Sequence, residues 1–388
     1  MKVGILTCHY PPAFGGGEKY TYALERALCN AGINCVSITS TREGNFKGDS
    51  SVIRLEPPVD FHKQEESIEW LKTAYDCIEK QNLSHLIVSN IHSVHAYFKD
   101  FIAKVKSLGV KVGIIYFDIH PNIRANLNQV YLETGSWEEA EMAIKEWALE
   151  QANFDEEDFN RVCDSPNFFD VDFIMSCSSW SLNFCDPLNK IPKFVLHPFI
   201  DVDVEHNNED SMLNHVDITM CNPIYHKGRS HMVNLINSYS HNWSYRVLEG
   251  FSGANQKHYF RKFIADSWAI RDDRVDLIEY LENVEDALIN TDLFFFPSRY
   301  EGYGMIPVEA IYFGKPVVAL DYPAVREGLG DAAYYVRWDA ESKEVIEAVE
   351  EVMFDIEDWR NKAQERVKFL KEREKAELKE FIAFLEVV

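Results

Sequence analysis

Several features that would assign this chain to a specialised class of protein are missing from its sequence. The eight cysteines stand at positions 8, 29, 35, 77, 163, 177, 185 and 221, and no two form the close pair that zinc and redox sites favour. We therefore expect reduced, mostly packed thiols in a cytoplasmic protein. No apolar run approaches the roughly 20 residues that a membrane span requires. Residues 1–6 carry one basic residue and do not resemble a signal peptide, although peripheral membrane contact stays open.

Positive charge is also scarce. The chain has 39 Lys and Arg against 63 Asp and Glu, which gives a formal net charge of −24. Self-repulsion of this size opposes long-range attraction to nucleic acids and anionic membranes, although a local basic pocket could still bind phosphate. Nucleic acid is therefore a disfavoured but open partner. The 388 residues, of which 46% are hydrophobic, are sufficient for two packed domains.

The first half alternates short apolar runs with amphipathic stretches, as in a parallel sheet covered by helices. The predicted strands are 3–7, 34–39, 86–89, 111–117, 173–177 and 193–196. Between the first two, residues 18–30 repeat apolar side chains at helical spacing and end before Gly32, which predicts a βαβ unit. Residues 131–170 are acidic and aromatic and indicate an inserted helical region.

A polar stretch from Pro192 to about Asn208 predicts an interdomain linker, and a second α/β series follows it. Its predicted strands are 217–220, 244–248, 275–278, 293–296, 316–320 and 333–336. Residues 356–388 mix apolar and charged side chains and predict a long solvent-facing helix or helix pair. The sequence thus predicts an α/β protein of two Rossmann-like, doubly wound domains, residues 1–197 and 198–371, with 372–388 packing back on the first.

Three glycines, Gly15, Gly16 and Gly17, stand where the first predicted strand gives way to a helix. Bare amides at a helix N-terminus attract anions such as phosphate. A tight turn with positive φ would explain the glycines equally well. The run is not G-x-G-x-x-G with an acidic residue at the end of the next strand, so a nicotinamide site is disfavoured.

A second candidate binding segment is the run Asn-Pro-Ile-Tyr-His-Lys-Gly at residues 222–228, which follows a predicted strand of the second domain. Most lysines are simply solvated. Lys227, however, lies between a strand end and Gly228, at the edge of the sheet where ligands of such folds bind. A diphosphate is its natural partner.

The most informative segment is residues 294–310, in which an apolar strand ends in a glycine-rich turn between two carboxylates. Glu301 falls in the turn and can accept hydrogen bonds from ligand hydroxyls. Glu309 falls in the next helix, and the free amides near Gly304, Met305 and Ile306 can hold phosphate oxygens. Isolated carboxylates are usually solvated, but the flanking pattern favours a binding site.

These residues resemble the GT-B glycosyltransferases of family 4. In that family two glutamates separated by seven residues follow an apolar strand with Pro-Ser and precede Gly-x-Pro-Val-Val. Glu301, Glu309 and the runs on either side of them fit this pattern. The opening Pro-x-x-Gly-Gly-Gly-Glu-x-Tyr at residues 12–20 and the run at 28–36 match the family's N-terminal signature, so the resemblance spans nearly the whole chain.

The resemblance implies a role for each matching residue. Gly16 and Gly17 would lie near the diphosphate and sugar of the donor, and Lys227 would bind the diphosphate. Glu301 would contact the hydroxyls of the transferred sugar, and Glu309 would hydrogen-bond the nucleotide ribose.

Two further positions follow from the same comparison. His120 comes after a first-domain strand, where the family often carries a histidine that faces the transferred sugar, so it is a third catalytic candidate with Glu301 and Lys227. Where the family usually has an arginine five residues before the lysine, this chain has Asn222. One cation is thus missing from the expected diphosphate site, and Arg229 or Arg299 could replace it.

The implied reaction is retaining transfer of a sugar from a UDP- or GDP-type nucleotide sugar to a hydroxyl acceptor, which could be a glycan, a lipid or a modified nucleic acid. Front-face attack needs no covalent nucleophile, because a lysine and helix amides stabilise the leaving diphosphate. We expect neither a metal site nor a further cofactor. The alternatives are a GT-B enzyme with another reaction on nucleotide sugars, and a catalytically silent protein that only binds them.

Overall fold

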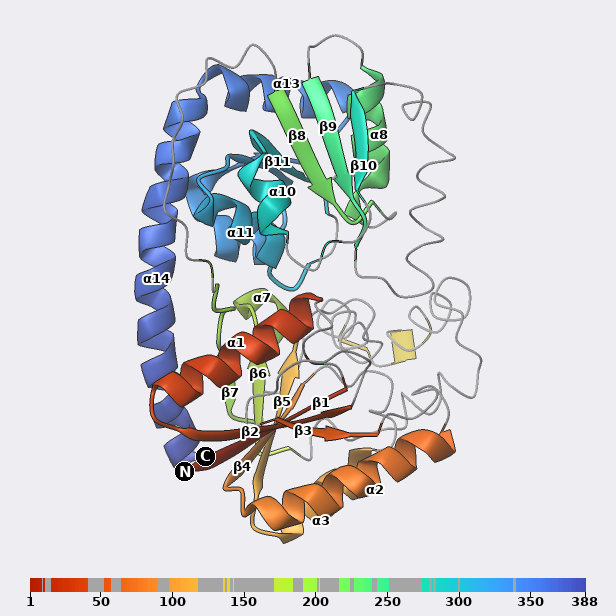
Figure 1. Cartoon of the computed structure of the whole chain (residues 1–388), viewed down its shortest axis with the longest axis vertical. Coiled ribbons are helices and arrows are strands. Elements are labelled where there is room, and N and C mark those ends of the chain that lie inside the picture. Colours follow the sequence, from red (N-terminus) through yellow and green to blue (C-terminus); the bar gives the residue numbers. More distant parts are fainter. Residues whose placement is uncertain are drawn as a thin grey trace. The chain divides into compact units, whose positions relative to one another are not determined.

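The computed structural model groups the chain into two compact units (Figure 1). The first comprises residues 1–199 and 374–388, and the second comprises residues 200–373. The residues that the structure describes are 1–8, 10, 15–40, 52–56, 64–89, 98–117, 135–136, 138–139, 142, 171–183, 191–200, 202, 216–223, 227–238, 243–250, 274–278, 281, 284–298, 301–337 and 340–388.

A seven-stranded sheet forms the centre of the first unit, in the order β3-β2-β1-β4-β5-β6-β7, and every pair of neighbours is parallel. Its strands are β1 (Lys2–Thr7), β2 (Asn34–Ser40), β3 (Val52–Leu55), β4 (His85–Ser89), β5 (Lys111–Tyr116), β6 (Phe173–Ser176) and β7 (Lys193–Val195). Strands that helices cover on both faces are rich in apolar residues. All of β4 and all but the first residue of β1 are accordingly buried.

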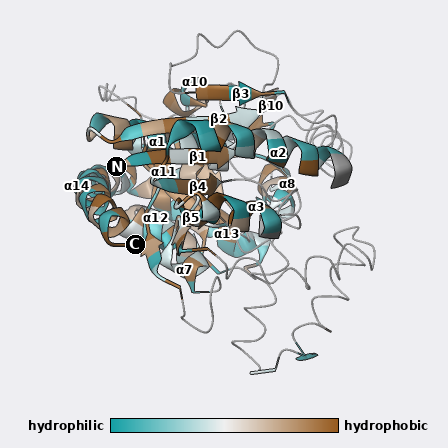
Figure 2. Cartoon of the chain, turned by 90° about the horizontal axis from the view of Figure 1, so that it is seen from below, coloured by the Kyte–Doolittle hydropathy of each residue, from teal (hydrophilic) through white to brown (hydrophobic). Residues whose placement is uncertain are grey.

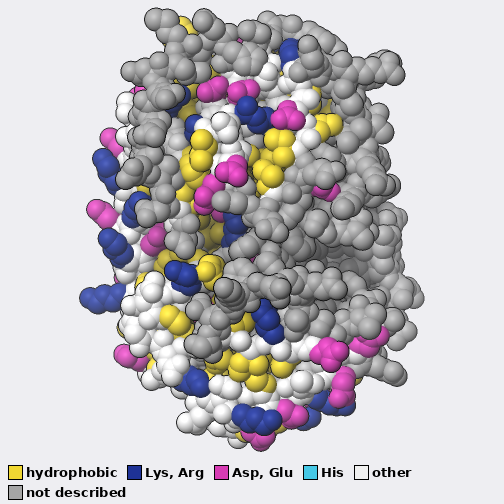
Figure 3. All heavy atoms as spheres, in the orientation of Figure 1, with side chains coloured by type: hydrophobic (Ala, Val, Ile, Leu, Met, Phe, Trp, Pro, Cys, Tyr) yellow, Lys and Arg dark blue, Asp and Glu magenta, His cyan; other side chains and the backbone are white. Residues whose placement is uncertain are grey.

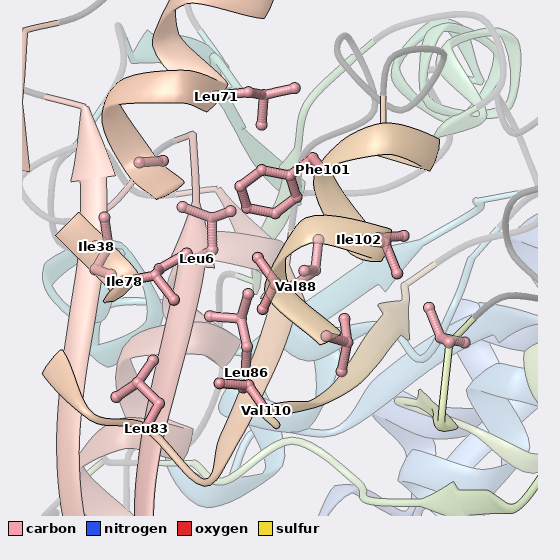
Figure 4. Close-up of a cluster of buried hydrophobic side chains, with 14 of the residues drawn as sticks. Leu6, Ile38, Leu71, Ile78, Leu83, Leu86, Val88, Phe101, Ile102 and Val110 are labelled. Atoms are coloured by element: carbon pink, nitrogen blue, oxygen red, sulfur yellow. The ribbon is translucent and has the colours of Figure 1, made fainter. Parts of the chain in front are cut away.

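Helices connect and cover these strands. They are α1 (Gly16–Asn30), α2 (Gln64–Gln81), α3 (Phe98–Ser107) and the short α7 (Ser179–Leu182). Leu71 of α2 and Phe101 of α3 share one apolar cluster with Leu6 and Val88 of the sheet (Figure 4). Burial of each large apolar side chain contributes about 1.5–3 kcal/mol, so this layer is a main source of stability for the first unit.

The second unit has the same plan with a six-stranded parallel sheet, in the order β10-β9-β8-β11-β12-β13. Its strands are β8 (Val216–Cys221), β9 (Trp243–Leu248), β10 (Val275–Ile278), β11 (Leu293–Phe296), β12 (Val317–Leu320) and β13 (Ala333–Val336). The helices are α8 (Arg229–Asn237), α10 (Glu285–Ile289), α11 (Met305–Tyr312), α12 (Pro323–Leu329) and α13 (Ser342–Phe354), with a 3-10 turn at Gly330–Ala332. Met232 of α8 and Val349 of α13 pack with Ile218 and Phe295 in the core.

The C-terminal helix α14 (Ile356–Val387) has residues in both units. It is one continuous helix, and Figure 2 shows it as mostly hydrophilic with interspersed apolar residues. Figure 3 shows Lys, Arg, Asp and Glu side chains along its exposed side. The expected solvent-facing helix is therefore present as a single element rather than a pair.

The last turns of α14 pack on the first unit. The ring centroids of Phe381 and Phe384 lie 5.2 and 5.3 Å from that of Phe194. Phe381 is fully buried. Polar contacts with Glu377 also hold this part of the helix. Its carboxylate accepts a hydrogen bond from the backbone amide of His197 and lies 2.7 Å from the Nδ1 atom of the His197 ring.

The predicted fold class of two doubly wound α/β domains is confirmed. Strands 275–278, 293–296 and 333–336 match their predicted bounds, and the other predicted strands differ by one residue at an end or at both ends. The prediction that 192–208 is a linker is wrong at its start, because residues 193–195 form β7 and pair with β6. The predicted helical region at 131–170 lies almost entirely outside the described residues.

The strand β3 was not predicted, and α1 begins at Gly16 rather than at residue 18. All four residues of β3 are only half-buried at the edge of the sheet, and Arg54 interrupts the apolar run. Such an edge strand lacks the continuous apolar pattern on which the other strands were predicted.

Replacement of Phe381 by alanine should destabilise the first unit by about 3–5 kcal/mol, because it opens a cavity in a fully buried aromatic cluster. The neighbouring exposed Glu380 offers a matched control, and Glu380→Ala should change stability by less than about 0.5 kcal/mol. Urea unfolding followed by circular dichroism measures both. Equal midpoints for the two variants would contradict the packing of this helix on the first unit.

Candidate active site

The candidate site of the second unit lies at the carboxyl ends of β8 and β11. These strands are neighbours at the centre of the sheet, and the chain continues outward from them on opposite sides, to β9 and to β12. In open α/β sheets ligands bind where the strand order reverses in this way. Asn222 follows β8, and Ser298 and Glu301 follow β11.

A glycine sets the distance between the two loops. Gly228 has φ +83°, and a Cβ at this position would collide with the backbone carbonyl of Pro297. Only glycine combines this left-handed conformation with so close an approach. The loop after β8 therefore rests directly on the end of β11.

The contact brings two predicted site residues together. Lys227 Nζ lies 2.6 Å from Glu301 Oε1, and their side chains are 20% and 12% exposed. A charge-assisted bond of this length fixes both side chains. Because neither group is fully buried, a polar ligand can still reach the pair.

The turn from Glu301 to Gly304 leads into α11. Gly304 is the N-cap residue with φ +84°, so the turn depends on a second left-handed glycine. The first amides of a helix have no partner inside the helix and point outward with the positive end of its dipole. Met305 and Ile306 provide such amides, whereas Pro307 has none. This N-terminus is suited to binding a phosphate.

Glu309 lies in the second turn of α11 and is 5% exposed, with its Oε2 atom shielded from solvent. The usual expectation for a helix glutamate, a solvated charge, does not apply here. Burying a carboxylate is costly unless hydrogen bonds compensate for its lost hydration. Its burial close to a helix N-terminus suited to an anion is consistent with a ligand-binding role.

Asn222 adopts a left-handed conformation with φ +60°, which is uncommon for a residue other than glycine. A Cβ on Gly250 would lie 2.6 Å from the Asn222 side chain, so this amide covers the end of β9. Its Oδ1 atom is buried and has no hydrogen-bond partner among the described residues. Of the two cations considered as substitutes for the expected arginine, Arg229 is the first residue of α8, and Arg299 lies outside the described residues.

In the first unit the glycine run forms the start of α1. Gly15 is the N-cap, and its amide donates to Glu18 Oε2 at 2.9 Å. Gly16 and Gly17 lie in the first helical turn and have no positive φ. The tight-turn explanation with positive φ is therefore wrong. The glycines instead leave the helix N-terminus without side chains, which gives a phosphate access to its backbone amides.

Polar contacts hold α1 both at this N-terminus and further along the helix. Thr21 Oγ1 donates to the Gly17 carbonyl at 2.7 Å and lies 2.6 Å from Ser89 Oγ at the end of β4. The Tyr10 hydroxyl donates to the buried carboxylate of Glu25. Burial raises the pKa of Tyr10, and the adjacent negative charge raises it further. His120, the remaining predicted site residue, lies outside the described residues.

The comparisons with known proteins agree with this geometry. Residues 251–382, which contain Glu301, Glu309 and the N-terminus of α11, match the family described as Glycosyl transferases group 1. This part of the chain is therefore similar to the group 1 glycosyltransferases. A curated relative, the lipopolysaccharide core biosynthesis mannosyltransferase LpsB of Rhizobium meliloti (strain 1021), is 42% identical over 55 residues. That alignment covers 14% of this chain and 16% of LpsB.

Solved glycosyltransferases share the fold over the whole chain. Sucrose-phosphate synthase from Thermosynechococcus elongatus matches with a TM-score of 0.73 at 15% identity, covering 100% of this chain and 98% of that one. Anabaena HepE, solved in complex with UDP-glucose, matches with a TM-score of 0.71 at 12% identity over 100% of both chains. The predicted resemblance to GT-B glycosyltransferases is confirmed. Membership of family 4 stays a prediction.

Three further properties concern only the described residues of this chain. Each helix among them is too short or too polar to cross a lipid bilayer. No three His, Cys, Asp or Glu side chains of these residues are grouped to hold a metal ion. The six described cysteines form no disulfide.

Gly228→Ala tests the contact that sets the site. The added Cβ meets both an unfavourable φ and the Pro297 carbonyl, so we expect a loss of about 2–4 kcal/mol. Gly32 has nearly the same φ, +84°, with open space around its Cβ position, and Gly32→Ala should cost only about 1 kcal/mol. Thermal unfolding of the two variants compares them, and equal losses would refute the close approach.

Proposed function

We propose that this chain is a retaining glycosyltransferase that transfers a sugar from a UDP- or GDP-type nucleotide sugar to a hydroxyl acceptor. The observation that carries the proposal is the 2.6 Å pair of Lys227 and Glu301 beside the N-terminus of α11. A sugar nucleotide presents a diphosphate and sugar hydroxyls side by side. The site offers a cation and amides for the first and a carboxylate for the second.

Departure of the nucleoside diphosphate is the step that these groups assist. As the bond between the anomeric carbon and the diphosphate oxygen breaks, negative charge collects on the phosphate. Lys227 and the amides of Met305 and Ile306 are positioned before the reaction and stabilise that charge as it develops. The acceptor hydroxyl attacks from the same face, and its proton passes to the departing phosphate oxygen, so the anomeric configuration is retained.

Each carboxylate has a separate task in this mechanism. Glu301 accepts hydrogen bonds from hydroxyls of the transferred sugar and, as the partner of Lys227, orients the ammonium group. Glu309, which is buried in the second turn of α11, accepts hydrogen bonds from the ribose hydroxyls. His120, Gly16 and Gly17 are proposed to complete the donor contacts, as the resemblance implies.

A catalytically silent nucleotide-sugar-binding protein is the second candidate, and Asn222 is the observation that favours it. An uncharged amide there supplies less charge to a leaving diphosphate than an arginine would. Assays for free nucleotide and for transferred sugar separate the two candidates. The proposed acceptor is a glycan, a lipid or a modified nucleic acid, and the cytoplasmic setting suggested by the cysteines stays a prediction.

A panel of nucleotide sugars should reveal the donor. A ligand that binds only the folded state raises its stability by about 2.7 kcal/mol at 100 times its dissociation constant. We expect a clear rise in melting temperature with one UDP- or GDP-sugar, and UDP-glucose is the first choice because HepE was solved with it. NMR of the product then shows the anomeric configuration. Unchanged melting temperatures across the panel would sink the proposal, and an inverted product would reject the retaining mechanism.

Glu301→Gln and Glu309→Gln should have different effects. The first should lower transfer by about 100-fold or more while nucleoside diphosphate binding stays near normal, because it removes a charge that orients the reacting groups. The second should weaken binding of the free nucleotide by about 10-fold through loss of a charge-assisted hydrogen bond. The exposed Glu365→Gln is the control. Isothermal titration and initial rates measure both effects, and two variants that behave like the control would contradict the assignment.

A further inference from the structure

A cation of the C-terminal helix reaches the turn that carries Glu301. Arg373 Nη2 on α14 donates to the Tyr303 hydroxyl at 2.5 Å. Its Nη1 donates to the Glu327 carbonyl near the end of α12 at 3.0 Å. Both contacts lie within the second unit, although the residues are 70 and 46 positions apart in the chain.

Tyr303 is the side chain that anchors this turn. Gly302 and Gly304 stand on either side of it and contribute no side chain, while their backbones retain wide conformational freedom. Tyr303 is 3% exposed, and its ring lies against Gly328 of α12, where an added Cβ would come within 3.3 Å of Cζ. The path of the chain from Glu301 to the first amide of α11 therefore depends on how Tyr303 is held.

The bond to the Glu327 carbonyl fixes the Arg373 side chain independently of Tyr303. The last carbonyls of a helix lack internal partners and carry the negative end of its dipole, so cations stabilise them. Arg366, two turns earlier on α14, donates to the Gly328 carbonyl at 2.9 Å and to the Glu327 carbonyl at 2.6 Å. The Glu327 carbonyl thus accepts from both arginines. Burial lowers the pKa of Arg366, and the charge of Arg373 lowers it further.

We propose that Arg373 is a positioning residue for the candidate active site. By donating to the Tyr303 hydroxyl it holds the turn from Glu301 to Gly304 in the conformation in which Glu301 and the α11 amides bind the donor. This inference rests on the function proposed above. It adds a residue of the C-terminal helix that acts on the donor only through Tyr303.

The two arginines allow the positioning role to be separated from a structural one. Both donate to carbonyls at the end of α12, and Arg373 also donates to the Tyr303 hydroxyl. Arg366→Lys is therefore the matched control, and it should lower stability with little change in donor affinity. Tyr303→Phe keeps the buried ring and removes only the acceptor, so it tests the bond without a cavity.

The experiment has two readouts. The first is hydrogen exchange of the amides at residues 301–306 in the ligand-free protein, which should become faster in Tyr303→Phe and Arg373→Ala but not in Arg366→Lys. The second is the dissociation constant of the best nucleotide sugar of the panel, or of UDP-glucose where several bind. It should rise about 5- to 10-fold in each of the two variants, which is less than the full contribution of a hydrogen bond to a charged group, because this bond acts on the donor only through the turn.

The double variant Tyr303→Phe with Arg373→Ala decides whether the two residues act together. Coupled residues give effects that do not add, so the double variant should weaken donor binding no more than Arg373→Ala alone. Additive losses, or unchanged exchange at 301–306 in Tyr303→Phe, would overturn the positioning role. A wild-type protein that binds no nucleotide sugar would instead overturn the proposed function, whatever the exchange data show.

Discussion

The approach of the Gly228 backbone to the Pro297 carbonyl is the contact on which the second unit's site depends. It joins the loop after β8 to the end of β11, at the point where the strand order of the sheet reverses. Without it the loops that carry Lys227 and Glu301, 74 positions apart, would not be held in contact. The cation, the carboxylate and the first amides of α11 form one site because a residue without a side chain lets two strands' loops touch.

The electrostatics of that site are typical of binding rather than of stability. Removing a lysine and a glutamate from water costs several kcal/mol per ion, and their attraction offsets this cost only in part. Selection for stability alone would favour apolar residues here. The second carboxylate makes the same point, because Glu309 is buried in a helix whose other side chains are mostly apolar. Groups that are costly to bury and that surround a helix N-terminus are explained by an anionic, hydroxyl-rich ligand.

The extent to which the sequence predicts this structure depends on how local each feature is. Continuous apolar runs such as 293–296 identify the buried strands, and parallel pairing then places Asn222 and Glu301 at one edge of the sheet. The half-buried β3 lacks such a run and is missed. The burial of Glu309 and the orientation of Asn222 toward Gly250 are set by neighbours distant in the chain, so no local pattern could have predicted them.

The Tyr303 turn illustrates the same limit and its consequence. A turn built from glycines can approach a ligand closely, but it cannot hold its own shape, because it has few side chains with which to pack. Order must then come from elsewhere in the fold, and here it comes from α14, whose sequence is that of an ordinary charged surface helix. Nothing in its pattern distinguishes Arg373 from its solvated neighbours. Through Arg373 the C-terminal helix contacts this glycine-rich turn across 70 positions of sequence, so a residue far from the turn in the chain contributes to holding it.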